Sequence, residues 1–386
     1  MMSVIKKMMI SVLSGISKIY LKHRNRIFAI PNQTECDAFL DNIWKPSKVY
    51  SEHTFDHDVE VDSLIDLSVI IPLYNAEPFI RKCVDSLISQ KTKYRYEIIL
   101  VNDGSTDQTQ KVMEEYSQKY PLLIQIVTQQ NRGISVARNE EIAKARGKYI
   151  GFIDQDDWVK DQYIEILLNT AYKNNSDIVK CGYSDIDLKN QMRIWQNESI
   201  HIEKDEHEKF LHVNGYVWGG IFDRKLWRKV RFPEGYWYED MIVRMLIFRQ
   251  SKCFINIPDV LYIKRLHENN ASIVLWKKSS PKSLEEYYLL KELYIECRKI
   301  GLSADSLEFR FALYEMGNML FARIFSMKTK EKKFVFASVA HWISEIYRDE
   351  YIRTLSESEK FLLGAFVRYD YKAWKVASVY ARMQVE

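Results

Sequence analysis

Residues 148–153 read Lys-Tyr-Ile-Gly-Phe-Ile, and residues 154–157 continue Asp-Gln-Asp-Asp. The first six form an apolar run with the length of a buried β-strand. Three carboxylates then crowd the end of that strand, and charges this close repel one another unless a cation lies among them. An Asp-x-Asp pair at a strand end therefore favours a hard divalent metal shared with nucleotide phosphates. The alternative is an acidic turn in which Asp157 or Asp161 caps the next helix.

Strand and helix patterns alternate before this stretch, beginning at Leu67. The predicted strands are residues 67–73, 97–102, 124–128 and 148–153, and the predicted helices are residues 77–90, 108–119 and 134–146. This alternation predicts a doubly wound α/β domain, whose ligands bind at the carboxyl ends of the strands. Polar residues fall at three of these ends: Tyr74 with Asn75, Asp103, and Asp154. Ordinary turns are also polar, so this pattern alone does not separate a site from loops.

Composition limits the class of protein. The 386 residues are 47% hydrophobic and 13% aromatic, which suffices for a packed interior, and the net charge of +4 does not imply nucleic-acid binding. The five cysteines are widely spaced and never form a Cys-x-x-Cys pair, which argues against zinc and against disulfides. We therefore expect a reducing, cytoplasmic compartment.

The first part of the chain is basic. Residues 1–26 contain six Lys and Arg residues and no acidic one. The apolar segment 8–20 is shorter than the ~20 residues of a membrane span and lacks a cleavage site. It fits either a helix lying on an anionic membrane, which would place the protein at the inner face of the cell membrane, or an ordinary packed helix. We expect residues 27–66 to be an extended connection.

Other nucleotide-binding signatures are missing from the sequence. It contains no Gly-x-Gly-x-x-Gly, and the Gly147-Lys148 pair has Tyr149 where a phosphate-binding loop needs Ser or Thr. Dinucleotide oxidoreductases and P-loop NTPases are therefore disfavoured.

Four ordered segments resemble glycosyltransferase family 2. They are residues 68–75 (Ser-Val-Ile-Ile-Pro-Leu-Tyr-Asn), 97–107 (Glu-Ile-Ile-Leu-Val-Asn-Asp-Gly-Ser-Thr-Asp), 131–139 (Asn-Arg-Gly-Ile-Ser-Val-Ala-Arg-Asn) and 154–157. The resemblance implies a GT-A fold, with a doubly wound mixed sheet, and inverting transfer of a sugar from a nucleotide diphosphate donor. It is strong from Leu67 to about Asp187 and looser to about Ile273.

The range of this resemblance predicts that the chain has three parts. Residues 1–66 would be the basic arm and connection. Residues 67–273 would be the GT-A domain, with a donor-binding half at 67–187 and an acceptor half at 188–273. Residues 274–386 would be a mainly helical C-terminal region, whose apolar stripes repeat at helical spacing. Those helices could form a lid over the acceptor, an oligomer contact or a membrane-facing surface.

The resemblance assigns roles at the donor edge. Pro72 and Tyr74 would line the base pocket, and Asp103 would accept a hydrogen bond from the imide N–H of uracil. The Arg138 guanidinium would suit base or phosphate oxygens, the alternative being an ion pair on the helix surface. The implied donor-binding residues are Pro72, Tyr74, Asn75, Asp103, Arg138, Asp154 and Gln155.

The resemblance also implies a metal and a catalytic base. Asp156, with Asp154, would hold Mn²⁺ or Mg²⁺. Asp240, with Glu239 as the fallback, would take the proton of the acceptor hydroxyl, and a helix N-terminus after it would favour the ionised carboxylate. The alternative is that both acids only cap a helix spanning residues 241–248.

Aromatic residues near this Glu-Asp pair could stack on sugar faces, although core packing is the commoner role of Trp. The predicted acceptor-binding residues are Trp218, Trp237, Tyr238 and Asp157. His267 resembles part of a polar loop that closes over the donor phosphates in relatives, the alternative being an ordinary surface residue.

We therefore predict a metal-dependent inverting glycosyltransferase. It would transfer a hexose or N-acetylhexosamine from a nucleotide-sugar donor, with UDP favoured, to a saccharide or lipid-linked saccharide acceptor in the synthesis of surface polysaccharide or glycoconjugate. The alternatives are a nucleotidyltransferase on a similar fold and a catalytically silent scaffold that binds nucleotide sugars.

Overall fold

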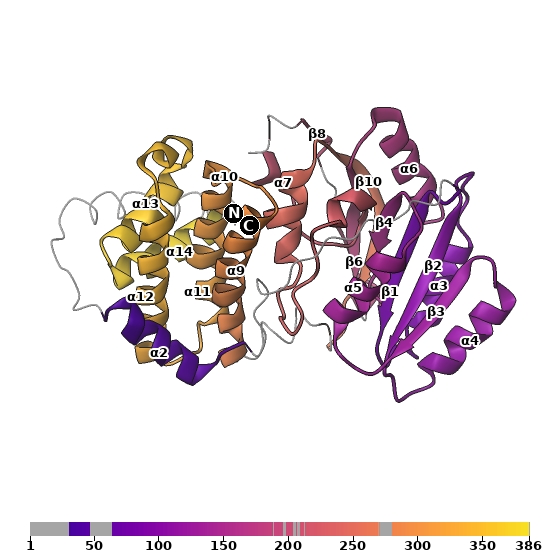
Figure 1. The fold of residues 1–386 in the computed structure, drawn as a ribbon, viewed down its shortest axis with the longest axis horizontal. Helices are drawn as coiled ribbons and strands as arrows, with labels where there is room; N and C mark the ends of the chain where they lie inside the picture. The colour runs from indigo at the N-terminus through magenta and orange to yellow at the C-terminus, as the bar shows by residue number, and fades with distance from the viewer. Residues whose placement is uncertain are drawn as a thin grey trace. The chain divides into compact units, whose positions relative to one another are not determined.

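The computed structural model describes residues 31–46, 64–270 and 280–385, apart from residues 188, 196–197, 204–205, 207–208, 212 and 269. The chain divides into two compact units (Figure 1). We call residues 48–270 the sheet unit, and residues 1–47 together with 271–386 the helical unit. The basic arm predicted for residues 1–26, and the domain boundary predicted near residue 273, lie outside the described residues.

The described residues of the sheet unit form a mixed sheet of ten strands. They are β1 (Leu67–Leu73), β2 (Tyr96–Asp103), β3 (Ile124–Gln129), β4 (Tyr149–Phe152), β5 (Trp158–Val159), β6 (Ile178–Ile186), β7 (Met192–Trp195), β8 (Ile200–Glu203), β9 (Gly220–Asp223) and β10 (Cys253–Arg265). The order is β3-β2-β1-β4-β9-β6-β10-β5, and β7 pairs with β6 while β8 pairs with β10. The first four strands in this order are mutually parallel, whereas β9 runs antiparallel to both β4 and β6.

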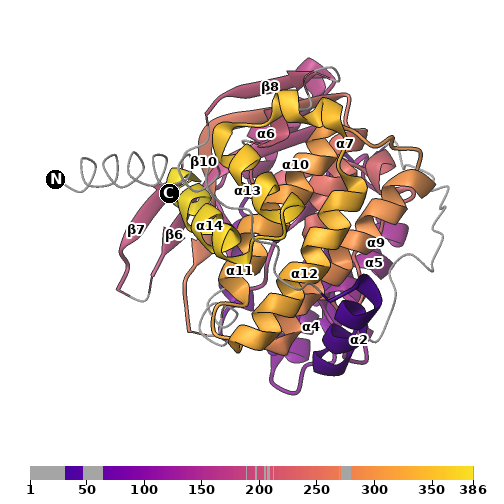
Figure 2. The same ribbon diagram turned by 90° about the vertical axis from the view of Figure 1, so that its left-hand side faces the viewer.

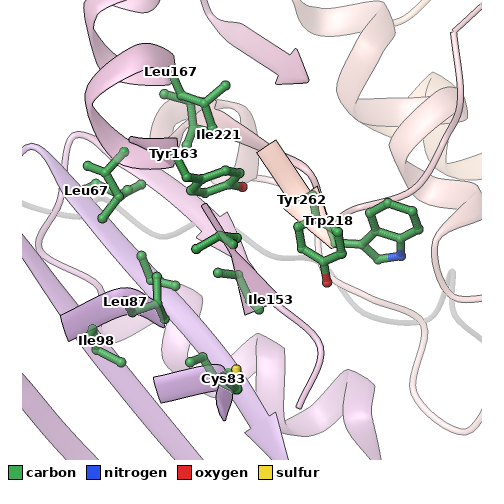
Figure 3. Close-up of a cluster of buried hydrophobic side chains, with 14 of the residues drawn as sticks. Leu67, Cys83, Leu87, Ile98, Ile153, Tyr163, Leu167, Trp218, Ile221 and Tyr262 are labelled. Carbon is green, nitrogen blue, oxygen red and sulfur yellow. The ribbon is translucent and has the colours of Figure 1, made fainter. Parts of the chain in front are cut away.

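Helices cover both faces of this sheet. They are α3 (Ile80–Ile88), α4 (Thr109–Lys119), α5 (Ile134–Lys144), α6 (Tyr163–Asn174), a 3-10 turn (Arg224–Trp227), a π-helical turn (Val243–Ile247) and α7 (Phe248–Gln250). Cys83 and Leu87 of α3 and Leu167 of α6 pack in one apolar cluster with Leu67 of β1 (Figure 3). Helix α5 contacts β1 and β2 but contributes no residue to that cluster, so it covers the opposite face.

Strand β1 is buried along its whole length, which explains its continuous apolar sequence. Its register with β2 runs from Leu67 opposite Tyr96 to Leu73 opposite Asn102. Its pairing with β4 ends at Ile70. Pro72, which has no N–H to donate, lies beyond the last β4 partner, so it interrupts no pairing with β4.

The described residues of the helical unit form helices and short turns. They are α2 (Gln33–Ile43), a 3-10 turn (Pro281–Leu284), α9 (Glu285–Lys299), α10 (Ser306–Tyr314), a π-helical segment (Glu315–Met319), α11 (Leu320–Arg323), α12 (Thr329–Ile346), a 3-10 turn (Asp349–Thr354), α13 (Glu357–Val367) and α14 (Tyr371–Val385). Among the described residues, none of the helices is both long enough and apolar enough to cross a membrane.

The expectation of an extended connection was wrong for residues 33–43, which form helix α2. Asn32 and Glu35 form a reciprocal capping box at its start. The helix lies beside α12 (Figure 2), where the Phe39 ring stacks on Phe334 with centroids 3.8 Å apart. Leu40 is also buried in this unit. A helix this short is only marginally stable on its own, so this packing stabilises it.

Candidate functional site

A buried arginine joins two of the predicted motifs. Arg138, on α5, is only 2% exposed, and its Nη2 donates to Asp154 Oδ1 at 3.0 Å while its Nη1 donates to Glu239 Oε1 at 2.9 Å. Its guanidinium also lies 5.0 Å from the ring centroid of Phe232. The Asp-x-Asp loop after β4 and the Glu-Asp pair are therefore in one cluster, although 85 residues separate the two carboxylates that Arg138 binds.

The two carboxylates beside Arg138 are reluctant to ionise. Burial raises the pKa of Glu239 from 4.5 to about 7, despite the opposing effect of Arg138, and the charge of Asp240 adds to the increase. Burial likewise raises the pKa of Asp154, again against Arg138 and with Asp156 and Asp240 adding to the increase. Burial and mutual repulsion thus favour the protonated forms of Asp154 and Glu239, and a further cation would stabilise their ionised forms.

Glu239→Gln is expected to change how stability depends on pH. Folded Glu239 holds its proton up to about pH 7, whereas the unfolded residue loses it near 4.5. The folded state therefore binds more protons in this window, so the free energy of unfolding falls as pH rises from about 4.5 to 7. In the wild type this decrease is on the order of 1–3 kcal/mol, and the Glu239→Gln variant should lack it. Urea unfolding of both proteins at several pH values measures this difference.

Glu114→Gln, at an exposed position on α4, is the control and should keep the wild-type dependence of the free energy of unfolding on pH. The raised pKa of Glu239 is refuted if Glu239→Gln keeps that dependence as well.

Asp156 is held by a loop that follows β10. Its Oδ2 lies 2.8 Å from Nε2 of His267 and accepts from Nδ2 of Asn270 at 2.9 Å. The imidazole stacks on Phe79, with ring centroids 4.9 Å apart. Two residues predicted separately, Asp156 and His267, are thus direct neighbours, and Asn270 is a partner that the sequence did not reveal.

Asp157 is part of the scaffold of this loop. Its side chain is 2% exposed, Oδ2 accepts from the hydroxyl of Tyr262 at 2.7 Å, and Oδ1 accepts from the backbone N–H of Arg265 at 2.8 Å. Burial, together with the charges of Asp156 and Asp154, raises its pKa well above the ordinary value. Because both oxygens of this buried carboxylate already accept hydrogen bonds from the protein, it is not accessible to an acceptor sugar. We therefore remove Asp157 from the predicted acceptor residues.

Asp103 lies at the carboxyl end of β2, as predicted, and is 4% exposed. Its Oδ1 accepts from Gln129 at 2.7 Å and from the backbone N–H of Arg132 at 2.9 Å, while Oδ2 accepts from the N–H of Gly133 at 2.8 Å. Gly133 has φ +91°, a conformation that strongly favours glycine. A carboxylate can accept about four hydrogen bonds, so one more donor can still bind.

The residues after β1 connect the neighbouring loops. The backbone N–H of Tyr74 donates to Gln155 Oε1 at 2.7 Å, and Gln155 Nε2 donates back to the Tyr74 carbonyl at 3.2 Å. Asn75, at φ +48°, accepts from the N–H of Thr106 at 2.8 Å. The ends of β1, β2 and β4 are therefore tied together at one edge, and the Tyr74 side chain, 45% exposed, is accessible there.

The predicted role of Trp218 in sugar stacking conflicts with its surroundings. Its ring stacks on Tyr216 on one side, with centroids 4.5 Å apart, and on Tyr262 on the other, at 4.7 Å. Both faces are taken, and the side chain is 7% exposed. Tyr238 is also buried, at 5% exposure, whereas Trp237 is 38% exposed. Of the predicted aromatic residues, Trp237 alone keeps the accessibility that stacking on a sugar requires.

Asp240 stands at the start of a short helical stretch. Its carbonyl accepts from the N–H of Val243 at 2.9 Å, but the expected α-helix over residues 241–248 is instead largely the π-helical turn Val243–Ile247. Such turns are uncommon and are frequent at functional sites. Asp240 is half-buried, and its charge raises the pKa values of both Asp154 and Glu239, so it belongs to the same cluster.

Sequence reasoning missed the strand that positions the Asp-x-Asp loop. Besides binding Asp157, Tyr262 accepts from the N–H of Asp154 at 3.3 Å, and Arg265 Nε donates to the carbonyl of Asp156 at 3.0 Å. Both residues lie on β10, more than 100 residues downstream. No local motif marks them, and only the sheet order brings them to the loop.

Comparison with solved structures identifies the fold. S. aureus TarS, residues 1–349 in complex with UDP-GlcNAc, matches with a TM-score of 0.66 at 18% identity, over 83% of this chain and 92% of that chain. A likeness at this identity concerns the fold alone. It confirms the predicted α/β class, a GT-A mixed sheet followed by a mainly helical region.

Sequence comparison identifies the family. Residues 68–230 match the model of Glycosyl transferase family 2. The uncharacterized glycosyltransferase EpsJ of Bacillus subtilis (strain 168) is 34% identical over 239 residues, which are 58% of this chain and 68% of EpsJ. The minor teichoic acid biosynthesis protein GgaB of the same strain is 30% identical over 226 residues, 56% of this chain but only 24% of GgaB. This chain belongs to glycosyl transferase family 2, as its motifs predicted.

Proposed function

We propose that this chain is an inverting glycosyltransferase that transfers a hexose or N-acetylhexosamine from a UDP-sugar to a saccharide or lipid-linked saccharide acceptor of a surface polymer. Family membership supports the reaction class, and the TarS complex with UDP-GlcNAc supports the donor. The relationship to GgaB, a teichoic acid biosynthesis protein, supports a cell-surface acceptor. The five cysteines, all free and buried, fit a cytoplasmic site of synthesis.

The observation that carries the proposal is the double ion pair of Arg138. It fixes Asp154, on the donor side, and Glu239, beside the proposed base, to one guanidinium. Catalysis by direct displacement needs the leaving group and the attacking hydroxyl on opposite sides of one anomeric carbon. A rigid buried link between the two halves holds the groups that act on those two sides at a fixed separation.

Asp240 is the proposed general base. The acceptor oxygen forms the new bond to the anomeric carbon while the bond to the diphosphate oxygen breaks, and the hydroxyl proton passes to the Asp240 carboxylate. Glu239 is less suited to this task because its Oε1 already accepts from Arg138 and because burial favours its protonated form. We therefore keep Glu239 as the fallback base only.

The residues at the Asp-x-Asp loop fit a divalent metal. Asp154 and Asp156 offer carboxylate oxygens, the ligands that Mn²⁺ and Mg²⁺ prefer, and His267 lies 2.8 Å from Asp156 and holds its carboxylate in place. Within the described ranges these atoms do not form a compact group of three ligands, so the donor phosphates would have to complete the coordination. When bound, the metal would neutralise charge on the departing diphosphate.

Stabilisation by ligands tests the proposal. We expect UDP or a UDP-sugar with Mn²⁺, at about 100 times the dissociation constant, to raise the free energy of unfolding by ~2.7 kcal/mol. Asp156→Ala should abolish the metal-dependent part of this gain, because it removes the carboxylate that His267 and Asn270 hold in place. Thermal unfolding with UDP, GDP and their sugars, each with and without Mn²⁺, measures it.

Asp259→Ala, at an exposed position, is the matched control and should respond to the ligands like the wild type. Absence of any shift with every UDP compound would overturn the donor assignment. A full metal-dependent shift in Asp156→Ala would overturn the metal assignment alone.

A further inference from the structure

Three side chains of different chemistry share one face where β8 pairs with β10. The strands are antiparallel, with Glu203 opposite Cys253 and His201 opposite Ile255. Alternate residues of a strand point to the same side, and directly opposite residues share a face. His201, Glu203 and Cys253 therefore meet on one side of this two-stranded edge.

Their possible ligand atoms lie close together. The imidazole nitrogen, the carboxylate oxygen and the sulfur are all within 4.8 Å of one another, the one such group of three among the residues that the structure describes. His201 Nε2 is 2.7 Å from Glu203 Oε1 and 3.3 Å from Cys253 Sγ. Around a tetrahedral zinc ion, with bonds of about 2.0–2.3 Å, ligand atoms are roughly 3.3–3.7 Å apart. The His201–Glu203 and His201–Cys253 distances thus need to grow by less than about 1 Å to admit the ion.

Burial differs among the three in a way that permits this adjustment. Cys253 is 8% exposed and fixed, with Sγ 3.4 Å from Ser176 Oγ. The side chains of His201 and Glu203 are 52% and 61% exposed, so they can move and a metal ion can enter from solvent. A fixed sulfur with two mobile, accessible partners is an arrangement that can close around an incoming cation.

We propose that His201, Glu203 and Cys253 form a binding site for Zn²⁺, with a water molecule as the fourth ligand. Thiolate, imidazole and carboxylate together select zinc over Mg²⁺ or Mn²⁺, which prefer oxygen. Binding replaces the thiol proton, which is released to solvent. The spacing of the cysteines argued against zinc because it considered only Cys pairs, whereas here the register of two strands assembles the ligands.

The site would hold the edge strand β8 to β10, the strand whose far end carries Tyr262 and Arg265. It is chemically distinct from the metal site proposed at Asp156, which has no sulfur ligand. This inference does not depend on the proposed function, and the two fail separately.

Cobalt absorption tests the site in the full chain. Co²⁺ should produce a thiolate-to-metal charge-transfer band in the near ultraviolet, which Zn²⁺ should remove by displacing the cobalt. Cys253→Ser should abolish the band. His201→Ala, at an exposed position that folding tolerates, should weaken cobalt binding by ~10-fold or more, because even indirect partners of metal ligands are worth ~10–100-fold.

Two variants serve as controls and should keep the band. Cys36→Ser removes a buried cysteine of the helical unit, and Asp156→Ala removes the ligand proposed for the donor metal. The zinc site is refuted if no charge-transfer band forms, if the band survives Cys253→Ser, or if His201→Ala leaves cobalt affinity unchanged.

Discussion

Asp240→Asn is expected to lower kcat by about 10²–10⁴-fold, the usual contribution of a general base, while leaving the affinity for the nucleotide donor nearly unchanged. Asparagine keeps the size of the side chain but cannot take the acceptor proton. The donor contacts proposed for Asp103 and Asp156 remain in place, so binding energy on that side should be preserved. Release of UDP under steady-state turnover measures kcat, and calorimetric titration with UDP measures the affinity.

Two further variants make this result specific. Asp259→Asn changes an exposed aspartate of the same unit and should retain wild-type kcat. Glu239→Gln separates the two candidate bases, because it should reduce turnover less than Asp240→Asn does. Wild-type turnover in Asp240→Asn, together with a collapse in Glu239→Gln, would transfer the role of base to Glu239.

Arg138→Met should lower the free energy of unfolding by about 3–5 kcal/mol, the usual result of removing one partner from a buried ion pair. The methionine approximates the length of the side chain but leaves Asp154 and Glu239 beside each other without their shared cation. Chemical unfolding at neutral pH measures the loss. Adding Glu239→Gln to this variant should restore little of it, because burial already favours protonated Glu239 at neutral pH once Arg138 is gone.

Arg81→Met is the matched control for this experiment. Arg81 and Glu115 form an ion pair whose side chains are 55% and 46% exposed, and such surface pairs contribute about 0–1 kcal/mol. If Arg138→Met were no more destabilising than Arg81→Met, the buried bridge would not be holding the two motifs together.

The strands and helices from residue 67 to residue 153 could be predicted well because their signals are local. Strand β1 has the bounds expected, Leu67–Leu73, since all seven of its residues are buried and the sequence is a continuous apolar run. Helix α5 begins at Ile134 as expected, directly after the positive-φ Gly133. Parallel strands buried on both faces leave an unambiguous pattern, and their carboxyl ends then follow from topology.

One local signal was present but overlooked. The segment from Asn32 to Glu35 is a capping box, followed by Phe39 and Leu40 at positions that a helix would bury. Its prolines and polar residues favoured an extended interpretation. The helix became recognisable only through its apolar partners on α12, which lie about 300 residues later in the chain.

The contacts of the acceptor side could not be predicted from sequence. Trp218 was predicted to stack on a sugar although core packing is the commoner role of Trp, and its actual contacts depend on Tyr262, a residue of a distant strand. The same holds for Asp157, whose burial depends on β10. Sheet order and register depend on residues far apart in the sequence. A motif can therefore indicate candidate residues, but it does not show which of their side chains remain accessible to a ligand.

Helix α2 has a consequence for how this chain is made. It precedes the sheet unit in sequence, yet it packs on α12, which follows that unit. A ribosome working at about 5–20 residues per second would therefore complete the entire sheet unit before the partner of α2 emerges. During that interval the apolar face of α2 has no native surface to cover it. The helical unit can therefore complete its fold only after the whole sheet unit has been synthesised, although its first helix is made before that unit.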